Sequence, residues 1–198
     1  MRGLARQIGR LSCLLALVTG CGHLVYADGP YHGRVLDAET KQPIEGAAVL
    51  AVWLKRSYGE GHPSITYYDA QETLTDQDGY FTIRGIVHMS LNLLARIDEP
   101  QFTIFKPRHE AYGNRRLSPP EPGGLRVVIL RPISTREDRL KSLSRTSPYS
   151  VCLTEEEADR LKMPDLSPGT PDCIPRDKIP NLIRLKDTEH KQLGLGQR

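Results

Sequence analysis

Two cysteines in the C-terminal third of the chain, Cys152 and Cys173, have the type and spacing for one covalent reaction. Neither has another Cys or a His within four residues, whereas structural zinc sites use paired ligands at short spacing. In an oxidising compartment such an even pair forms a disulfide, which would stabilise the fold by roughly 3 kcal/mol. We therefore predict a Cys152–Cys173 disulfide, with free thiols or a metal site as the alternatives.

The residue patterns of common catalytic sites are missing from the sequence. The histidines at 32, 62, 88 and 109 are scattered singly, and a metal needs ligands that converge on one point. The sequence has no Gly-x-Ser-x-Gly motif and no glycine-rich phosphate loop. Asp76 and Asp78 lack the further oxygens of a calcium loop, so we assign them to a turn. The prediction is no catalytic residue, no metal site and no cofactor.

Aromatic residues gather around the loop at 55–64, whose Gly-Glu-Gly-His-Pro stretch favours flexibility. They are Trp53, Tyr58, Tyr67 and Tyr68. Exposed rings on a β-sheet can stack on sugars or pack against a protein, so this set is a possible binding surface. The alternative is packing in the core and at strand edges, which suits Trp53 best.

The N-terminus carries the features of an export signal. Arg2, Arg6 and Arg10 precede a short apolar run, residues 11–20, that ends in small residues. The run is about half the roughly 20 residues needed to span a bilayer, so a permanent membrane helix is not expected. We assign residues 1–20 to a signal peptide, with Cys13 inside it.

The end of this run, Leu17-Val18-Thr19-Gly20-Cys21, resembles the bacterial lipobox. The resemblance implies cleavage before Cys21 and attachment of acyl chains to it, with the membrane as partner, since two or more chains hold a domain stably on a bilayer. By analogy with enterobacterial sorting, Gly22 after the cysteine implies the periplasmic side of the outer membrane. Val25-Tyr26-Ala27 also resembles an ordinary signal-peptidase site, which would release a soluble periplasmic protein.

The charge balance argues against nucleic acid as a partner. Of the 27 basic residues, three lie in the first 20 positions, and the remaining 24 equal the 24 acidic residues. Binding to phosphates needs clustered Lys and Arg, which a neutral chain of this kind does not provide.

Residues 31–131 predict a β-sandwich, because short β-type runs alternate with turn residues. The run at 47–54 is apolar on both faces and predicts a central strand, as does 125–130. Asp76-Gln77-Asp78-Gly79 predicts a hairpin turn between strands at 64–75 and 80–84. Leu91, Leu93, Ala95 and Ile97 alternate with polar residues and predict one half-exposed strand. We count seven strands in antiparallel sheets.

Three motifs in this region resemble the carboxypeptidase regulatory-like domain, which is transthyretin-like in fold. They are Gly33-Arg34-Val35-Leu36-Asp37, Lys41-Gln42-Pro43-Ile44-Glu45-Gly46-Ala47 and Thr75-Asp76-Gln77-Asp78-Gly79-Tyr80-Phe81-Thr82-Ile83. The resemblance covers about half the chain and implies an accessory module without chemistry of its own. After Ile104 the sequence departs from the family pattern, so the resemblance says least about the last two strands.

Enzymes on the same architecture are the first alternative. Intradiol dioxygenases have a similar first part of the domain and a Trp like Trp53. They hold iron with two Tyr and two closely spaced His, and this sequence has no such His pair. A carbohydrate-binding module is the second alternative, and it would need a row of exposed aromatic rings.

The C-terminal part changes in character, since ten of the 15 prolines lie after residue 118. Ser134 and Glu137 have the spacing of a capping box for a helix to about Leu143, and Thr154 and Glu157 for a second helix. Residues from 179 to Leu193 predict a third helix, which would dock on the sandwich or bind another protein.

These observations predict four segments: a signal peptide at 1–20, a lipidated linker at 21–30, a β-sandwich at 31–131 and a mostly helical, Pro-rich extension at 132–198. The expected protein is a non-catalytic, lipid-anchored component of the cell envelope. Its sandwich would bind or support an envelope protein or a glycan.

Overall fold

The computed structural model describes residues 25–59, 62–89, 94–121, 124–146, 150–167, 170 and 173–195. The predicted signal peptide and Cys21 lie outside the described residues, as do Leu91 and Leu93 of one predicted strand and part of the 55–64 loop. None of the helices in the described part has both the length and the apolar character needed to cross a membrane.

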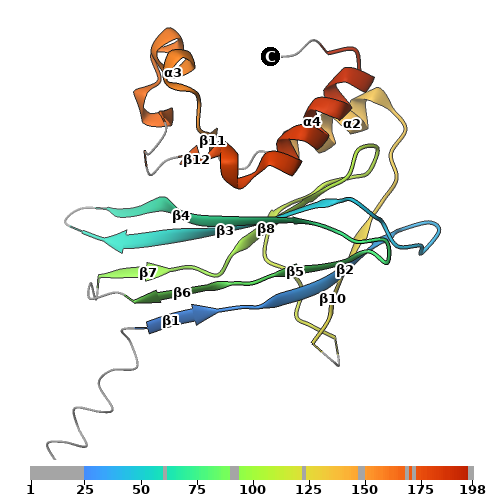
Figure 1. Ribbon diagram of the computed structural model, residues 1–198, viewed down its shortest axis with the longest axis horizontal. Helices are drawn as coiled ribbons and strands as arrows, with labels where there is room; N and C mark the ends of the chain where they lie inside the picture. The colour runs from blue at the N-terminus through green and yellow to red at the C-terminus, as the bar shows by residue number, and fades with distance from the viewer. Residues whose placement is uncertain are drawn as a thin grey trace, which may run out of the picture.

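The fold is mainly β, with sheets that are not closed (Figure 1). One sheet is centred on β3, which pairs with β4, β7 and β8, while β9 extends it beyond β8. Its strands are β3 (Ala48–Tyr58), β4 (Pro63–Leu74), β7 (Ala95–Ile97), β8 (Gln101–Phe105) and β9 (Tyr112–Arg115). The other layer has the order β10-β2-β5 and a two-stranded ribbon, β1-β6. Its strands are β1 (Val25–Asp28), β2 (Tyr31–Asp37), β5 (Tyr80–Ile83), β6 (Ile86–Met89) and β10 (Arg126–Leu130).

The central position of β3 is confirmed, and its sequence explains it. Alternate side chains point to opposite faces of a strand, so Val49 and Trp53 join the core between the layers, with Phe102 and Ile104 from β8. The other face of β3, with Leu50 and Val52, packs beneath the C-terminal helices. Residues 48–54 of β3 are buried on both faces, which explains why they are all apolar.

The predicted hairpin at Asp76–Gly79 is wrong in its pairing, although the tight turn is present. The Gly79 N–H donates to the Asp76 carbonyl at 3.0 Å, but β4 pairs with β3 and β5 pairs with β2. Gly79 lies against β2, where its carbonyl accepts from the Val35 N–H at 2.8 Å. A Cβ at Gly79, whose φ is +77°, would lie 2.5 Å from the Val35 carbonyl oxygen. The turn therefore carries the chain from one layer to the other.

Strand β10 also differs from expectation in two respects. It runs parallel to β2, so the sheets are not wholly antiparallel, and it lies at the edge of its sheet rather than at its centre. Ile129 on this edge is 54% exposed. Apolar composition could not separate an edge from a central strand here, because Val128 and Leu130 on the inner face are as buried as residues of a central strand.

Residues 25–28 belong to the β-fold and are not a linker. β1 pairs along its whole length with β6 and continues, after a break at Gly29-Pro30, into β2 beside β5. The two glycines at the break, Gly29 and Gly85, have positive φ, and a Cβ at Gly29 would lie 2.7 Å from the Gly85 Cα. The close contact of these two backbones requires glycine.

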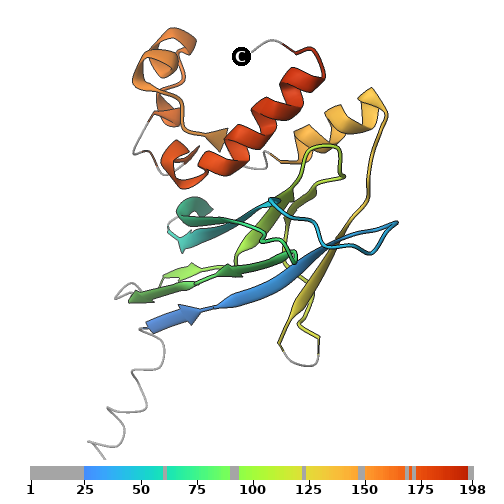
Figure 2. The same ribbon diagram turned by 45° about the vertical axis from the view of Figure 1, so that its right-hand side comes forward.

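The C-terminal extension covers the outer face of the β3/β4 sheet (Figures 1 and 2). It consists of α2 (Arg136–Arg145), β11 (Ser150–Val151), α3 (Glu155–Leu161), η2 (Pro164–Leu166), β12 (Cys173–Ile174), η3 (Arg176–Lys178) and α4 (Pro180–Gln192). The capping box of α3 at Thr154 and Glu157 is confirmed. The cap of α2 is Thr135 and not Ser134, since the Thr135 side chain accepts from the Asp138 N–H.

The third predicted helix, α4, docks on the sheet. Ile179 and Leu182 are buried in the outer apolar cluster with residues of β3. Both carboxylate oxygens of Glu72 on β4 accept backbone N–H groups at the start of α4, from Asn181 at 2.8 Å and Leu182 at 2.7 Å. Burial raises the pKa of Glu72, and these two hydrogen bonds oppose that rise. The sheet thus supplies the cap that Ile179, at the N-cap position, lacks.

Candidate functional site

The four aromatic residues predicted as a binding surface do not lie on one face. Trp53 is fully buried between the layers. Tyr67 and Tyr68 are half-buried on opposite faces of β4, Tyr67 beneath the C-terminal helices and Tyr68 against the inner core. Only Tyr58, at the end of β3, is exposed among them. The four residues therefore do not form the row of exposed rings that a carbohydrate-binding module would need, and packing explains three of them.

An irregularity between β3 and β4 separates the two neighbouring tyrosines. Trp53 pairs with Asp69 and Leu54 with Tyr67, so Tyr68 is an extra residue in the ladder. Its hydroxyl lies 2.7 Å from Nδ1 of His88 on β6, and the two rings meet edge to face at 4.9 Å between centroids. Burial raises the pKa of Tyr68, which keeps its hydroxyl protonated. This pair ties the β1-β6 ribbon to the larger sheet.

A half-buried carboxylate and three aromatic residues meet where β1 ends. Asp28 accepts a hydrogen bond from the Tyr31 hydroxyl and, at 2.9 Å, another from Nε1 of Trp53. The Tyr26 hydroxyl is buried and has no hydrogen-bond partner among the described residues. Burial raises the pKa of Tyr26 and of Tyr31, and the negative charge of Asp28 raises both further. We call these four residues the Asp28 cluster.

A cavity of about 420 Å³ opens beside the Asp28 cluster. Tyr31 and Phe102 meet in it edge to face at 5.2 Å, and the Arg126 guanidinium lies 4.9 Å from the centre of the Tyr31 ring. At its rim Arg116 pairs with Glu99 at 3.1 Å. The cavity is therefore lined by the guanidinium groups of Arg116 and Arg126 together with the carboxylates of Asp28 and Glu99.

The Asp28 cluster has a structural role, because its hydrogen bonds connect neighbouring strands. Asp28 already accepts hydrogen bonds from two donors of the protein itself. The two tyrosines have raised pKa values and stay protonated at neutral pH, so neither is an activated nucleophile. The cluster joins β1, β2 and β3.

The histidines predicted to be scattered lie apart in the structure. His32 contacts Thr82, His88 contacts Tyr68, and His109 contacts Asp37 at 3.1 Å. Within the described ranges, no group of three His, Cys, Asp or Glu residues could hold a metal ion. Asp76 Oδ1 accepts the N–H groups of Asp78 and Tyr80, as expected of a turn.

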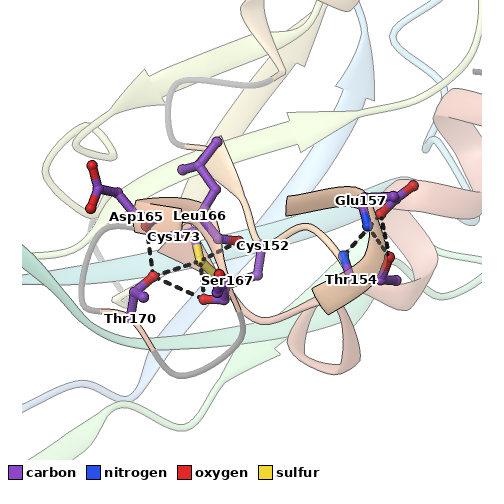
Figure 3. Close-up of a disulfide and its surroundings, with 8 residues drawn as sticks. All are labelled: Cys152, Thr154, Glu157, Asp165, Leu166, Ser167, Thr170 and Cys173. Carbon is purple, nitrogen blue, oxygen red and sulfur yellow. Dashed lines mark hydrogen bonds between the residues drawn. A yellow bond between two sulfur atoms is a disulfide. The ribbon is translucent and has the colours of Figure 1, made fainter. Parts of the chain in front are cut away.

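The predicted disulfide between Cys152 and Cys173 is present (Figure 3). The bridge connects Cys152, just after β11, to Cys173 in β12. These two short strands are parallel, and Ser150 pairs with Cys173. Thr170 donates to the carbonyl oxygens of Asp165 and Ser167 beside it. The bridge holds the Pro-rich segment next to the start of α3.

Comparison with known proteins gives no family. No family model matches the sequence, and no curated protein matches it. Two solved structures show limited likeness. One is a 9R-lipoxygenase from Cyanothece, with 16% identity over 38% of this chain and 10% of that chain, at a TM-score of 0.19. The other is an alternative pilotin of the Vibrio cholerae type II secretion system, with 13% identity over 56% of this chain and 99% of that chain, at a TM-score of 0.27.

The Asp28 cluster was not predicted, because residues 21–30 were expected to form a linker, whereas residues 25–28 form β1. One signal was available: Tyr26 and Asp28 alternate with Val25 and Ala27, which is the period of a strand. The partner of that strand, β6, lies far along the chain, and only the folded structure brings the two together.

Proposed function

We propose that this chain is an exported protein, anchored to a bilayer through acyl chains on Cys21, whose β-body binds or supports another envelope component without catalysis. The Cys152–Cys173 disulfide supports export, because such bonds persist in oxidising compartments. The basic and apolar N-terminal residues support the same route.

The observation that carries the proposal is the place of β1 in the fold. The competing cleavage after Ala27 would remove Val25, Tyr26 and Ala27, three of the four residues that pair with β6. It would also remove Tyr26 from the inner core, against which it packs. Cleavage before Cys21 leaves the whole strand in the mature chain. The pairing of β1 with β6 therefore supports processing at the lipobox over cleavage after Ala27.

We further propose that the β-body is a transthyretin-like sandwich of the carboxypeptidase regulatory-like kind. Support comes from the way the three motifs meet in space. The Val35 N–H donates to the Gly79 carbonyl, and the Val35 carbonyl accepts from the Ile44 N–H at 3.0 Å. A Cβ at Gly79 would lie 3.1 Å from the Pro43 Cβ. Motifs that are separate in the sequence thus form one contact cluster at one end of the β-body.

Mass spectrometry of the mature N-terminus tests the anchor. We expect an acylated Cys21 as the first residue, and we expect Cys21→Ser to abolish membrane fractionation. Cys13→Ser is the matched control, because it removes a cysteine from the predicted signal peptide and should leave fractionation unchanged. A mature chain that begins at Asp28 and fractionates with the soluble periplasm would refute the proposal.

A further inference from the structure

The β1-β6 ribbon carries apolar side chains on its solvent face. The register places Val25 opposite Met89 and Ala27 opposite Val87, so these four side chains share one face. Val25 is 50% exposed, Met89 74% and Val87 75%. The other face of the ribbon packs inward through Tyr26 and Ile86. A half-buried ribbon normally carries polar residues on its outer face, so this apolar face needs another explanation.

More exposed apolar side chains lie at the same end of the molecule. Tyr58 ends β3, Ile65 lies near the start of β4, and Leu94 precedes β7; all three are exposed. The Tyr58 N–H donates to the Leu94 carbonyl at 2.7 Å, so two of them are neighbours. In Figures 1 and 2 the start of β1 and the end of β6 lie at the same end of the β-body as the end of β3 and the starts of β4 and β7. Tyr58 and Ile65 follow the alternation of Leu54 and Tyr67, so they lie on the outer face of the larger sheet and not on the solvent face of the ribbon. We call the four apolar residues of the ribbon face the apolar end: Val25, Ala27, Val87 and Met89.

We propose that the apolar end lies against the lipid bilayer, with its side chains in the interfacial region. This inference rests on the proposed acylation of Cys21. Cys21 is four residues before Val25, and a residue spans at most about 3.6 Å, so the acyl chains would attach no more than about 14 Å from the apolar end. So short a tether holds this end, and no other, at the lipid surface. Apolar side chains at that place gain free energy by leaving water.

The test measures the surroundings of single positions in the full, acylated chain. Val87→Cys provides a free thiol for an environment-sensitive fluorophore, since Cys152 and Cys173 are bridged. Ile129→Cys on β10 is the matched control, because Ile129 is an exposed apolar residue on an edge strand of the same layer. Each labelled protein is reconstituted into vesicles of phosphatidylethanolamine and phosphatidylglycerol, with or without nitroxide-labelled lipid. Both substitutions are at exposed sites, and unchanged thermal unfolding verifies the fold.

We expect a blue-shifted emission and quenching by nitroxide lipid at position 87, and neither at position 129. An acylated, vesicle-bound protein whose probe at 87 reports water would overturn the membrane contact alone. A shift at 87 that appears in detergent and grows with protein concentration would also overturn it, in favour of a second copy of the chain. If mass spectrometry finds no acyl group on Cys21, the proposed function and this inference both fail.

Discussion

At the residue scale, Asp28 is the polar group on which three strands depend. Asp28→Ala leaves the Trp53 indole N–H and the Tyr31 hydroxyl without their acceptor. Because buried donors without a partner are costly, we expect the free energy of unfolding to fall by about 2 to 3 kcal/mol. Urea denaturation measures this loss. Asp78→Ala in an exposed turn is the control, and it should change stability by less than about 0.5 kcal/mol. Equal effects of the two substitutions would contradict the role of Asp28.

The stability of the fold should also depend on pH through Asp37. The N–H groups of Thr40 and Glu39 and the ring of His109 hydrogen-bond to Asp37 and lower its pKa to about 2. In the unfolded chain Asp37 binds its proton near the ordinary value of 3.8. Its contribution to stability is therefore complete above about pH 4 and is lost as the pH falls through 2.

Asp37→Asn tests this pH dependence. The difference in unfolding free energy between the natural protein and the variant should be constant above about pH 4 and should shrink toward pH 2. Urea denaturation at several pH values gives the difference, and Asp78→Asn controls for the loss of charge alone. A difference that stays the same from pH 6 to pH 2 would show that the Asp37 charge does not matter.

At the element scale, Glu72 joins α4 to the β3/β4 sheet. Glu72→Ala removes the acceptor of two backbone N–H groups at the start of the helix, at an expected cost of about 1 to 2 kcal/mol. We expect hydrogen exchange to accelerate in α4 while the strands of the inner core stay protected. Glu45→Ala at an exposed site is the control. Exchange that accelerates equally in α4 and in β2 would mean that Glu72 stabilises the whole fold rather than the docked helix.

Some of these elements could be predicted from the sequence and others could not. Strands such as β3 and the cap at Thr154 follow from local patterns, and the disulfide follows from the number of cysteines. The Asp76–Gly79 turn could be predicted from its residues. The strands on either side of it do not form a hairpin, because β4 pairs with β3 and β5 pairs with β2. The edge position of β10 and the place of β1 depend on partners far along the chain. The Asp28 cluster could not be predicted for the same reason, since Asp28 and Trp53 meet only after β1 has joined the fold.

At the scale of the whole molecule, the two faces of the central sheet have different coverings. The inner face packs on the β2 layer, and the outer face is covered by the disulfide-bridged extension. Arg139 of α2 pairs at 2.6 Å with the buried Glu189 of α4, and this ion pair joins the two long helices of the covering. The end of the β-body where β1 starts has no such covering in the described residues, and the apolar end lies there.

The dependence of the whole fold on β1 can be measured with two shortened chains. A chain that starts at Val25 keeps the complete strand, whereas one that starts at Asp28 has lost Tyr26 and most of the β1-β6 ladder. Because the shorter chain lacks the strand that pairs with β6 and the packing of Tyr26 against the core, we expect it to unfold at a lower urea concentration. Hydrogen exchange should be fastest in β6, which would lose its partner. If both chains unfold at the same midpoint, β1 adds nothing to stability, and the structural argument for cleavage before Cys21 rather than after Ala27 fails with it.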